Sequence, residues 1–447
     1  MTDFDAIFKA YDVRGTVPDQ FTADGARAIG GAFARFVAAA GQQAIVVGHD
    51  MRPEGPEFAA AFGQGALEHG VDVLDVGLCA TDMMYYASGC FDRPGAVFTA
   101  SHNPAGYNGI KMCLQGAAPI GRETGLDAIR DMAKAGPDPT GHRGTRSTLD
   151  LLDGYVAHVR SFVDLEALRP LRVVADTANG MGGLVVPAVF DGLPFELDHL
   201  FPELDGTFPN HPADPLQPEN QRDLVNRVLE VGADIGLAFD GDADRVFVVD
   251  ERARPISGSL TTALVARSIL ASHPGATVLH NLICSRVVPQ VIGEAGGVAV
   301  RTRVGHSFIK QRMAETGAIF GGEHSGHYYF RDNYRADSGL IAALVILEAV
   351  SHHRPGLADL LASLDRYASS GEINTEVDDV DVVLARVAGA YPDADHDHLD
   401  GLTVSFDDWW FNLRPSNTEP LLRLNLEAAD AEAVDRRVAE VMAHFVG

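Results

Sequence analysis

The first part of the chain alternates between two kinds of apolar pattern. Residues 22–40 and 57–69 place apolar side chains at the three-to-four-residue spacing of an amphipathic helix. Residues 43–48, 71–76 and 96–98 are short, nearly continuous apolar runs that are typical of buried strands. Strands that alternate with helices indicate βαβ units, so this part of the chain predicts an α/β domain with a largely parallel sheet.

The succession of strand, glycine-rich turn and helix returns twice further along the chain. A glycine- and proline-rich stretch at 135–145 indicates the edge of the first domain, and a proline-rich segment at 201–220 predicts irregular surface structure. The three-fold return hints at related modules. The elements predicted beyond residue 150 are strands 171–176, 235–239, 246–249 and 276–280 and helices 222–231, 259–270 and 308–315.

The pattern changes from about residue 369. Alternating apolar and polar positions at 372–377, 402–406 and 421–426 predict strands, and residues 431–445 have helical spacing. This mixture predicts a small α+β domain at the end of the chain. Its acidic loop at 393–400 contains two histidines, and we interpret it as a solvated loop rather than a metal site.

Length and charge restrict the classes of partner. A chain of 447 residues exceeds one hydrophobic core and predicts three or four domains. The formal net charge of −27 argues against nucleic acids and anionic membranes, whose surfaces need basic patches. The four cysteines lack metal-ligand spacing, no run approaches the about 20 apolar residues of a membrane span, and the first residues do not resemble a signal peptide. The expected location is the cytoplasm.

The most informative stretch is residues 99–104, Thr-Ala-Ser-His-Asn-Pro, directly after a predicted strand. Asn103 and Pro104 favour a tight turn, which would hold Ser101 at the open end of the sheet. A serine hydroxyl is a weak nucleophile unless a base or a metal activates it, or unless it already carries a transferable group. Ser101 is therefore the candidate around which the remaining chemistry is organised.

A second polar stretch, residues 239–245, joins two strand-like runs and reads Phe-Asp-Gly-Asp-Ala-Asp-Arg. Asp240, Asp242 and Asp244 crowd like charge, which costs stability unless a cation lies among them. A small set of oxygen ligands favours Mg²⁺ completed by waters or phosphate oxygens. An EF-hand is excluded because its glycine position is occupied by Arg245 and the flanks are strands. A dehalogenase-type phosphatase with Asp240 as the nucleophile stays open as an alternative.

A third stretch, residues 321–328, reads Gly-Gly-Glu-His-Ser-Gly-His-Tyr. In an extended chain, Glu323, Ser325 and His327 would alternate onto one face. A carboxylate, a hydroxyl and an imidazole suit a sugar, because the carboxylate accepts hydrogen bonds from neighbouring hydroxyls and the imidazole exchanges protons near neutral pH. This stretch therefore predicts a sugar-binding loop.

Several stretches supply the cations that an anionic ligand needs in so acidic a chain. Residues 414–420, Arg-Pro-Ser-Asn-Thr-Glu-Pro, would form either a phosphate-binding loop or a capping turn, and they lack the glycines and lysine of a P-loop. His306 and Lys310 lie one turn apart on a predicted helix, where they would flank a phosphate or face solvent. The other cations near these stretches are Lys9, Arg14 and Lys111.

Together these stretches resemble the α-D-phosphohexomutase superfamily, in particular its phosphomannomutase/phosphoglucomutase branch. The matching stretches occur in the family's order and span almost the whole chain. The resemblance implies an α/β fold in which three similar mixed-sheet domains and a C-terminal α+β domain surround a central cleft. The matching stretches are 9–15, 99–104, 240–245, 322–327 and 414–420, and the implied domains are 1–147, 148–252, 253–367 and 368–447.

The resemblance also implies a role for each candidate residue. It implies that Ser101 is a phosphoserine whose phosphate joins the three aspartates, Asp240, Asp242 and Asp244, in binding Mg²⁺. The residues implied around the transfer site are Arg14, Lys111, Arg245, His306 and His327. The residues implied to bind the substrate are Tyr11, Glu323, Ser325, Arg414, Ser416, Asn417 and Thr418.

The function implied by the resemblance is the interconversion of mannose 6-phosphate and mannose 1-phosphate through a hexose 1,6-bisphosphate. Glucose-selective relatives typically lack the final histidine of the sugar loop, and phosphoglucosamine mutases typically carry glutamine in place of His324. Mannose and glucose share the 3- and 4-hydroxyls, so glucose phosphates are also expected substrates. Ile283 stands where some relatives carry a lysine, and Arg286 is the candidate to replace it.

Three alternatives remain at this level: a phosphoglucosamine mutase, a dehalogenase-type phosphatase, and an inactive sugar-phosphate-binding protein. Three crowded carboxylates and an exposed serine loop exceed what binding alone requires. The expected partner is a small phosphosugar, with no nucleic acid and no membrane, and the expected assembly is a monomer or a homodimer.

Overall fold

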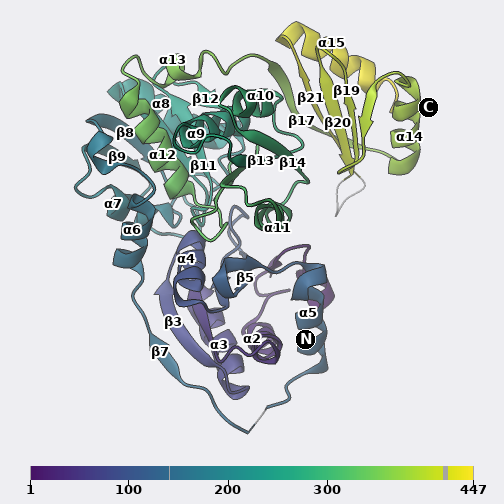
Figure 1. Cartoon of the computed structure of the whole chain (residues 1–447). Coiled ribbons are helices and arrows are strands. Elements are labelled where there is room, and N and C mark those ends of the chain that lie inside the picture. The colour runs from purple at the N-terminus through teal and green to yellow at the C-terminus, as the bar shows by residue number, and fades with distance from the viewer. Residues whose placement is uncertain (1, 140, 416–420, 446–447) are drawn as a thin grey trace.

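Four sheets follow one another along the chain, each packed with helices of its own segment (Figure 1). The computed structural model describes residues 2–139, 141–415 and 421–445, apart from the side chains of Glu123 and His306. The first three sheets mix parallel and antiparallel pairs, and the fourth is antiparallel throughout. The predicted fold class, three α/β domains followed by an α+β domain, is confirmed.

The first sheet has the order β1-β5-β4-β2-β3-β7, with β6 beside β5, and α2 packs against α3. Its strands are β1 (Val13–Thr16), β2 (Ala44–His49), β3 (Asp72–Leu78), β4 (Gly95–Phe98), β5 (Tyr107–Leu114), β6 (Ala118–Pro119) and β7 (Arg146–Thr148). Its helices are α1 (Phe4–Ile7), α2 (Ala23–Ala39), α3 (Gly55–Glu68), α4 (Thr81–Phe91) and α5 (Asp127–Ala135).

The second and third sheets have the orders β12-β11-β10-β8-β9 and β14-β13-β15-β16. The second segment contains β8 (Leu171–Asp176), β9 (Phe195–Leu200), β10 (Ile235–Phe239), β11 (Val246–Asp250), β12 (Pro255–Ile256), α6 (Leu152–Arg160), α7 (Gly182–Phe190) and α8 (Arg222–Val231). The third contains β13 (Thr277–Asn281), β14 (Val298–Thr302), β15 (Phe320–Gly322), β16 (Tyr328–Phe330), α9 (Gly258–Ser272), α10 (Val287–Glu294), α11 (His306–Thr316), α12 (Gly339–His352) and α13 (Leu357–Leu361).

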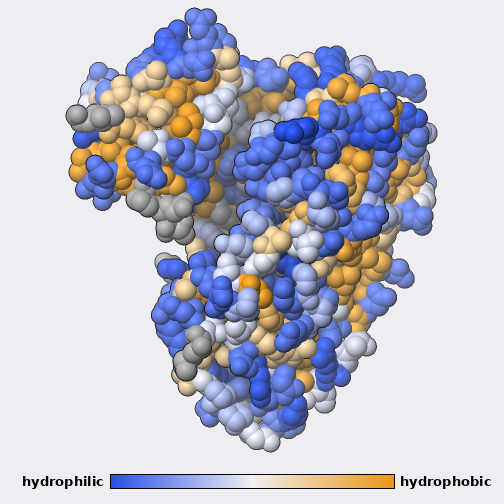
Figure 2. Space-filling model, turned by 180° about the vertical axis from the view of Figure 1, so that it is seen from behind, coloured by the Kyte–Doolittle hydropathy of each residue, from blue (hydrophilic) through white to orange (hydrophobic). Residues whose placement is uncertain are grey.

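The fourth sheet has the order β17-β21-β20-β19-β18 and carries two helices. Its elements are β17 (Ala368–Glu376), β18 (Asp395–Asp397), β19 (Leu402–Ser405), β20 (Trp410–Pro415), β21 (Leu421–Ala428), α14 (Val380–Ala390) and α15 (Ala431–Met442). We call this segment the C-terminal domain. It stands apart from the other three segments in Figure 1, and Figure 2 shows a hollow between it and the rest of the molecule.

One topology recurs in the first three sheets. A central strand (β2, β8 or β13) pairs in parallel with the next two strands of its segment. The second of these two then turns back into an antiparallel strand, in the hairpins β4–β5, β10–β11 and β15–β16. The first sheet is therefore mixed, and the prediction of a largely parallel sheet was wrong there because the turn after β4 reverses the chain. The three hairpin turns contain Ser101, the three aspartates and the predicted sugar loop.

The first three segments share one apolar core, which includes Met84, Phe239 and Leu344 from the three segments in turn. The first segment has a second core of its own around Phe33 and Phe62. The C-terminal domain has a separate core around β19, β20 and β21, with no member from the other segments among the described residues. None of the described helices combines the length and apolar character that a bilayer span requires.

Truncating the shared core should lower stability measurably. Leu237 on β10 is fully buried, so we expect Leu237→Ala to lower the free energy of unfolding by about 3 kcal/mol, through lost burial and the cavity left behind. Leu229 on α8 is 62% exposed, and Leu229→Ala should change it by less than about 0.5 kcal/mol. Urea unfolding followed by circular dichroism measures both, and equal effects of the two variants would contradict this account of the core.

Candidate active site

The turn after β4 holds Ser101 against the second segment. Ser101 has a left-handed backbone, with φ of 49°, and its side chain is almost fully buried. Its Oγ donates a hydrogen bond of 2.9 Å to Oδ2 of Asp240. A non-glycine residue held at positive φ costs backbone energy and is common at functional sites. The structure therefore brings the predicted serine and the predicted aspartate loop into direct contact.

The Ser101 turn is held by an arginine that the sequence patterns did not identify. Arg52, which follows β2, is fully buried and pairs with Asp50 at 3.5 Å. Its guanidinium donates to the carbonyl oxygens of Ser101 (2.9 Å) and Asn103 (2.7 Å), and to two further carbonyls of the same turn. These bonds satisfy backbone acceptors that a buried turn would otherwise leave unpaired. No local pattern in the sequence identifies Arg52, because the carbonyls that it binds lie about 50 residues further along the chain.

The aspartate loop closes the β10–β11 hairpin and faces Ser101 directly. A Cβ atom on Gly241 would lie 2.5 Å from the Ser101 carbonyl oxygen, so only glycine allows this approach of the two loops. All three aspartates are buried. Lys111 on β5 donates to Asp242 at 2.7 Å and to Asp244 at 2.6 Å. Arg245 donates to Asp240 at 2.9 Å.

The three carboxyl groups of this cluster differ in pKa. Burial raises the pKa of Asp240 to about 8, against the opposing effect of Arg245. Burial, with the nearby Asp242 charge, also raises the pKa of Asp244. The pKa of Asp242 lies below its usual range, because Lys111 and its hydrogen bond outweigh the effect of burial. Three acids therefore share two cations, and the cluster has the capacity to bind one more positive charge.

The carboxylate oxygens of the cluster fit a divalent cation. Ligand atoms of the three aspartates all lie within 4.8 Å of one another. Oδ1 of Asp242 and Oδ1 of Asp244 are buried and accept no hydrogen bond from the described residues. Buried acceptors without donors are costly, and hard cations such as Mg²⁺ prefer such oxygens. The donor set therefore suits a magnesium ion with open positions for a phosphate oxygen.

The sugar loop brings its three predicted residues together, but not through an extended chain. The loop turns, with the Gly326 amide donating to the Glu323 carbonyl and the Glu323 amide to the His327 carbonyl. Ser325 Oγ lies 3.0 Å from His327 Nδ1, and His327 Nδ1 lies 3.8 Å from Glu323 Oε2. The prediction of strand alternation was therefore wrong, because Gly326 at φ of 82° permits a tight turn there.

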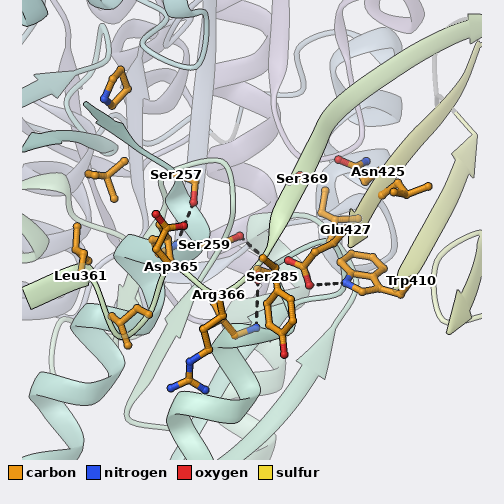
Figure 3. Close-up of a pocket in the computed structure, with 18 of the residues that line it drawn as sticks. Ser257, Ser259, Ser285, Leu361, Asp365, Arg366, Ser369, Trp410, Asn425 and Glu427 are labelled. Atoms are coloured by element: carbon orange, nitrogen blue, oxygen red, sulfur yellow. Dashed lines mark hydrogen bonds between the residues drawn. The ribbon is translucent and has the colours of Figure 1, made fainter. Parts of the chain in front are cut away.

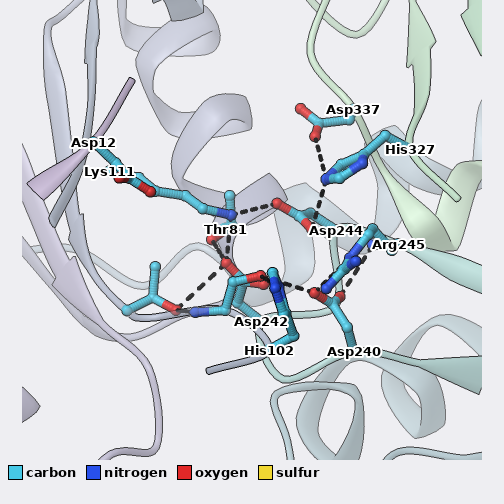
Figure 4. A network of polar contacts seen from close by, with 12 residues as sticks. Asp12, Thr81, His102, Lys111, Asp240, Asp242, Asp244, Arg245, His327 and Asp337 are labelled. Carbon is cyan, nitrogen blue, oxygen red and sulfur yellow. Dashed lines mark hydrogen bonds and ion pairs between the residues drawn. The ribbon is translucent and has the colours of Figure 1, made fainter. Parts of the chain in front are cut away.

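His327 lies between the sugar loop and the metal loop. Its Nε2 is 3.8 Å from Asp244 Oδ1 (Figure 4). Glu323 is buried and already accepts hydrogen bonds from Tyr329 (2.7 Å) and the Gly305 amide (3.1 Å). The side-chain amide of Asn281 donates a third hydrogen bond to it at 3.2 Å. A carboxylate has about four acceptor positions, so Glu323 keeps capacity for about one sugar hydroxyl. The arrangement joins sugar recognition to the site of Ser101.

Two predicted residues near the start of the chain also reach this region. Arg14 donates at 2.5 Å to the side chain of Asn103, two residues after Ser101, and it pairs with Asp12. The Tyr11 ring packs edge-on against Phe308 at 5.8 Å, so it meets α11 of the third segment. Arg14 therefore approaches the transfer site, and Tyr11 lies where the first and third segments meet.

A neutral histidine beside Ser101 was not singled out from the sequence. His102 Nδ1 lies 3.4 Å from Ser101 Oγ. Burial, reinforced by the nearby Arg245 and Arg14 charges, lowers the pKa of His102 well below its ordinary value. The imidazole therefore stays uncharged at neutral pH and adds no positive charge to the cluster.

The predicted phosphate loop lies mostly outside the described residues. Ser416, Asn417 and Thr418 belong to that part of the chain, and the side chain of His306 is likewise not described. Arg414 ends β20 opposite Arg423 of β21, and Glu372 lies 3.5 Å from the first and 3.7 Å from the second. The expectation for these four residues therefore stays a prediction, and Arg414 is placed at the base of the loop.

Two further cations, Lys310 and Arg286, make contacts that the sequence patterns did not predict. Lys310 neither flanks a phosphate nor faces solvent: it is buried, pairs with Asp337 at 2.9 Å and lies 3.6 Å over the Tyr85 ring. The helix pattern could not reveal that the first segment covers this face of α11. Arg286 donates to the carbonyls of Asp407 (2.9 Å), Phe406 (3.1 Å) and Trp409 (3.1 Å).

Arg286 therefore joins the third segment to the C-terminal domain. Its assignment as the replacement for a lysine at Ile283 stays a prediction. The Arg286 amide donates to Glu427, which also accepts from Trp410 Nε1 at 2.8 Å. A cavity of about 320 Å³ beside this contact is lined by Ile283, Ser285 and Glu427 among others (Figure 3). This cavity lies where the C-terminal domain meets the preceding segments, and its lining does not include Ser101.

Family profiles match the four segments in order. The profiles of phosphoglucomutase/phosphomannomutase alpha/beta/alpha domains I, II and III match residues 5–138, 153–254 and 257–367, and that of the C-terminal domain matches 372–444. The chain belongs to the phosphoglucomutase/phosphomannomutase family. As a member of this family it is an isomerase of the mutase type, which confirms the resemblance drawn from the five sequence stretches.

Individual relatives of this family cover almost the whole chain. A protein described as phosphohexose mutases, from Xanthomonas campestris pv. campestris, is 42% identical over 443 residues, 97% of this chain and 98% of that protein. A phosphomannomutase from Escherichia coli (strain K12) is 38% identical over 438 residues, 94% of each chain. A solved structure of a phosphoglucomutase/phosphomannomutase family protein from Burkholderia thailandensis is 33% identical with a TM-score of 0.91, covering 99% of this chain and 97% of that one.

The charge balance of the aspartate cluster predicts that Mg²⁺ binding releases a proton. The pKa of Asp240 is raised to about 8, so below that pH a proton competes with the cation. Mg²⁺ affinity should therefore rise with pH, by roughly tenfold between pH 7 and pH 8.5, and level off above that. Calorimetric titration in buffers of different ionisation enthalpy measures both the affinity and the proton release. Equal affinity at both pH values would contradict this charge assignment.

Proposed function

We propose that this mutase interconverts mannose 6-phosphate and mannose 1-phosphate, with Ser101 as the residue that carries the transferred phosphoryl group. The observation that carries the proposal is the 2.9 Å hydrogen bond from Ser101 to Asp240 within the buried aspartate cluster. Relatives named phosphomannomutase, 36–38% identical over nearly the whole chain, support mannose phosphates as substrates. Glucose phosphates are proposed as further substrates, because one relative is named phosphomannomutase/phosphoglucomutase.

The residues proposed to hold Mg²⁺ are the three aspartates, together with a phosphate oxygen on Ser101. The ion would neutralise charge that develops on the phosphoryl group during transfer. Lys111 and Arg245 lie on the same cluster and offset the remaining negative charge. Arg14 donates to the turn that bears Ser101 and so fixes the direction of its side chain. We propose that the chain divides into domains 1–147, 148–252, 253–367 and 368–447. With these boundaries, the Ser101 turn and the aspartate loop belong to different domains.

The proposed reaction has two transfers of opposite direction. In the first, a free sugar hydroxyl attacks the phosphorus of phospho-Ser101 and gives up its proton to a base, while the bond between phosphorus and Oγ breaks and Oγ takes up a proton to become the serine hydroxyl. The product is a hexose 1,6-bisphosphate, which turns within the site and returns its other phosphate to Ser101. His327, 3.8 Å from both Glu323 and Asp244, is the imidazole placed to receive the hydroxyl proton.

The proposed substrate contacts divide between two domains. Glu323 and Ser325 are proposed to bind the sugar hydroxyls, with Tyr11 nearby. Arg414, with Ser416, Asn417 and Thr418, is proposed to bind the phosphate that does not react. Because either end of the sugar can occupy this clasp, both transfers use the same Ser101. The proposed ligand is a small phosphosugar, and a hexose 1,6-bisphosphate is the proposed activator.

The dehalogenase-type alternative has no support in the geometry. A nucleophilic Asp240 needs an accessible carboxylate oxygen, whereas Oδ2 of Asp240 accepts from both Ser101 and Arg245. The aspartates also close an antiparallel hairpin and pack against the Ser101 carbonyl through Gly241. This arrangement favours Asp240 as a metal ligand beside a phosphoserine.

Removing the Ser101 hydroxyl should abolish the reaction. We expect Ser101→Ala to lower kcat for mannose 1-phosphate by at least about a thousandfold, because no residue then carries the phosphoryl group. Intact-mass spectrometry should find one phosphoryl group on the wild-type chain and none on this variant. Ser147→Ala, at an exposed position on β7, should keep both the phosphoryl group and the activity. Activity of Ser101→Ala close to that of the wild type would overturn the proposal.

Sugar preference is tested by comparing kcat/KM for mannose 1-phosphate, glucose 1-phosphate and glucosamine 1-phosphate. Mannose and glucose differ only at C2, which the proposed contacts to the 3- and 4-hydroxyls do not read. We therefore expect the values for mannose 1-phosphate and glucose 1-phosphate to agree within about tenfold. A clear preference for glucosamine 1-phosphate would instead identify a phosphoglucosamine mutase, and release of free phosphate would indicate a phosphatase.

A further inference from the structure

Asp82 is a buried carboxyl group at the junction of three domains. It lies in the first turn of α4 and is 1% exposed. Its Oδ2 accepts a 2.5 Å hydrogen bond from the Tyr155 hydroxyl on α6 and a 2.7 Å hydrogen bond from Ser338 Oγ. Among the described residues, no lysine, arginine or histidine pairs with it within ion-pair distance. The first, second and third domains therefore each contribute one side chain to this junction.

The junction costs stability that a neutral core would not. Burial raises the pKa of Asp82 to about 7, and its two hydroxyl donors reduce that shift only in part. A buried carboxyl group without a cation is poorly compensated, and apolar residues of similar size are often as stable or more stable there. The place of Asp82 in the first turn of α4 and a backbone hydrogen bond from Met83 offset part of this cost, but its pKa remains raised.

One connection from Asp82 to the aspartate loop runs through its neighbour in sequence, Thr81. Thr81 Oγ1 donates a 2.6 Å hydrogen bond to Asp242 Oδ2, and the Thr81 amide donates to the Asp242 carbonyl at 3.2 Å. Asp242 thus receives two bonds from the first turn of α4. The direction of that turn, which Asp82 fixes from its other face, determines where these donors lie.

A second connection from Asp82 to the aspartate loop runs through Ser338 and α12. Ser338 caps α12, since its Oγ accepts from the Ile341 amide at 3.2 Å while donating to Asp82. The next residue, Gly339, packs directly on the loop: a Cβ atom there would lie 2.8 Å from the Arg245 carbonyl oxygen and 2.9 Å from that of Ala243. The aspartate loop is therefore held between the first turns of α4 and α12.

We propose that Asp82 is a positioning residue for the metal-binding loop, which joins the first turns of α4 and α12 across three domains and thereby sets the affinity for Mg²⁺. The inference rests on the proposed metal site. Asp82 acts on the site through Thr81, whose hydroxyl holds Asp242 with one oxygen directed at Thr81 and Lys111 and the other free for a ligand. Such outer contacts commonly change metal affinity by about 10- to 100-fold.

The test measures the Mg²⁺ dissociation constant of the full chain by calorimetry, with inorganic Mg²⁺ as the probe. We expect Asp82→Ala to raise this Kd about tenfold, and Tyr155→Phe, which removes one donor and little volume, to raise it about threefold. In a Thr81→Val background, Asp82→Ala should weaken Mg²⁺ binding by a smaller factor than in the wild type, because the Thr81 hydroxyl no longer reaches Asp242 and the connection through α12 is the main one left. Thermal unfolding of each variant is recorded alongside.

A matched control separates positioning from a general loss of stability. Ser88 lies on the same helix α4, is fully buried and donates to the carbonyls of Arg93 and Leu114, away from the aspartate loop. Ser88→Ala should lower the Tm and leave the Mg²⁺ Kd unchanged. If the Asp82 and Tyr155 variants also lower the Tm and keep the wild-type Kd, the junction is only structural and the inference fails. A wild-type chain that binds no Mg²⁺ would overturn the metal site as well.

Discussion

The active site depends on a charge imbalance that is buried where three domains meet. Three aspartates share one lysine and one arginine, and burial removes the water that would otherwise screen them. The two cations pair with the loop, while a proton on Asp240 that a metal can displace and two carboxylate oxygens that accept no hydrogen bond from the described residues suit a divalent cation. The whole chain is strongly acidic, so its anionic ligand relies on these few cations and not on a general positive field.

Because three domains repeat the same topology, their hairpin turns bring three different sets of side chains to one site. Each of the first three domains reverses its chain after the third strand of its parallel set, and each reversal lies at the same position in the repeat. One turn presents a hydroxyl, the next three carboxylates, and the third a carboxylate with an imidazole. A shared apolar core fixes the three domains relative to one another, so the turns meet at distances short enough for hydrogen bonds.

Local patterns in the sequence predicted the elements and loops, while contacts between distant segments were beyond them. Helix α8 and strand β10 match the predicted ranges residue for residue, because each is amphipathic or apolar over its full length. Lys310 lies on a predicted helix, yet periodicity does not indicate which neighbour covers a helix face, and here Tyr85 from another domain does. Arg52 and Asp82 gave no local signal, since their partners lie in other loops and domains. The grouping of Glu323, Ser325 and His327 was predicted, but from an extended geometry that the turn at Gly326 replaces.

The independent core of the C-terminal domain has a consequence for the energetics of the cleft. Since its apolar side chains pack on one another and not on the neighbouring domain, a change in its orientation exposes little new hydrocarbon to water. The polar contacts between the two domains then contribute most of the free-energy difference between orientations. They include those of Arg286 with backbone carbonyls, the ion pair of Arg301 with Asp397 and the hydrogen bond from the Val304 amide to Asp400. Contacts of this kind are individually weak against water, so a phosphate that accepted charge-assisted hydrogen bonds from both sides of the cleft would add contacts of comparable size. A ligand that bound one orientation better than the other by only a few such contacts would therefore shift the balance between the orientations.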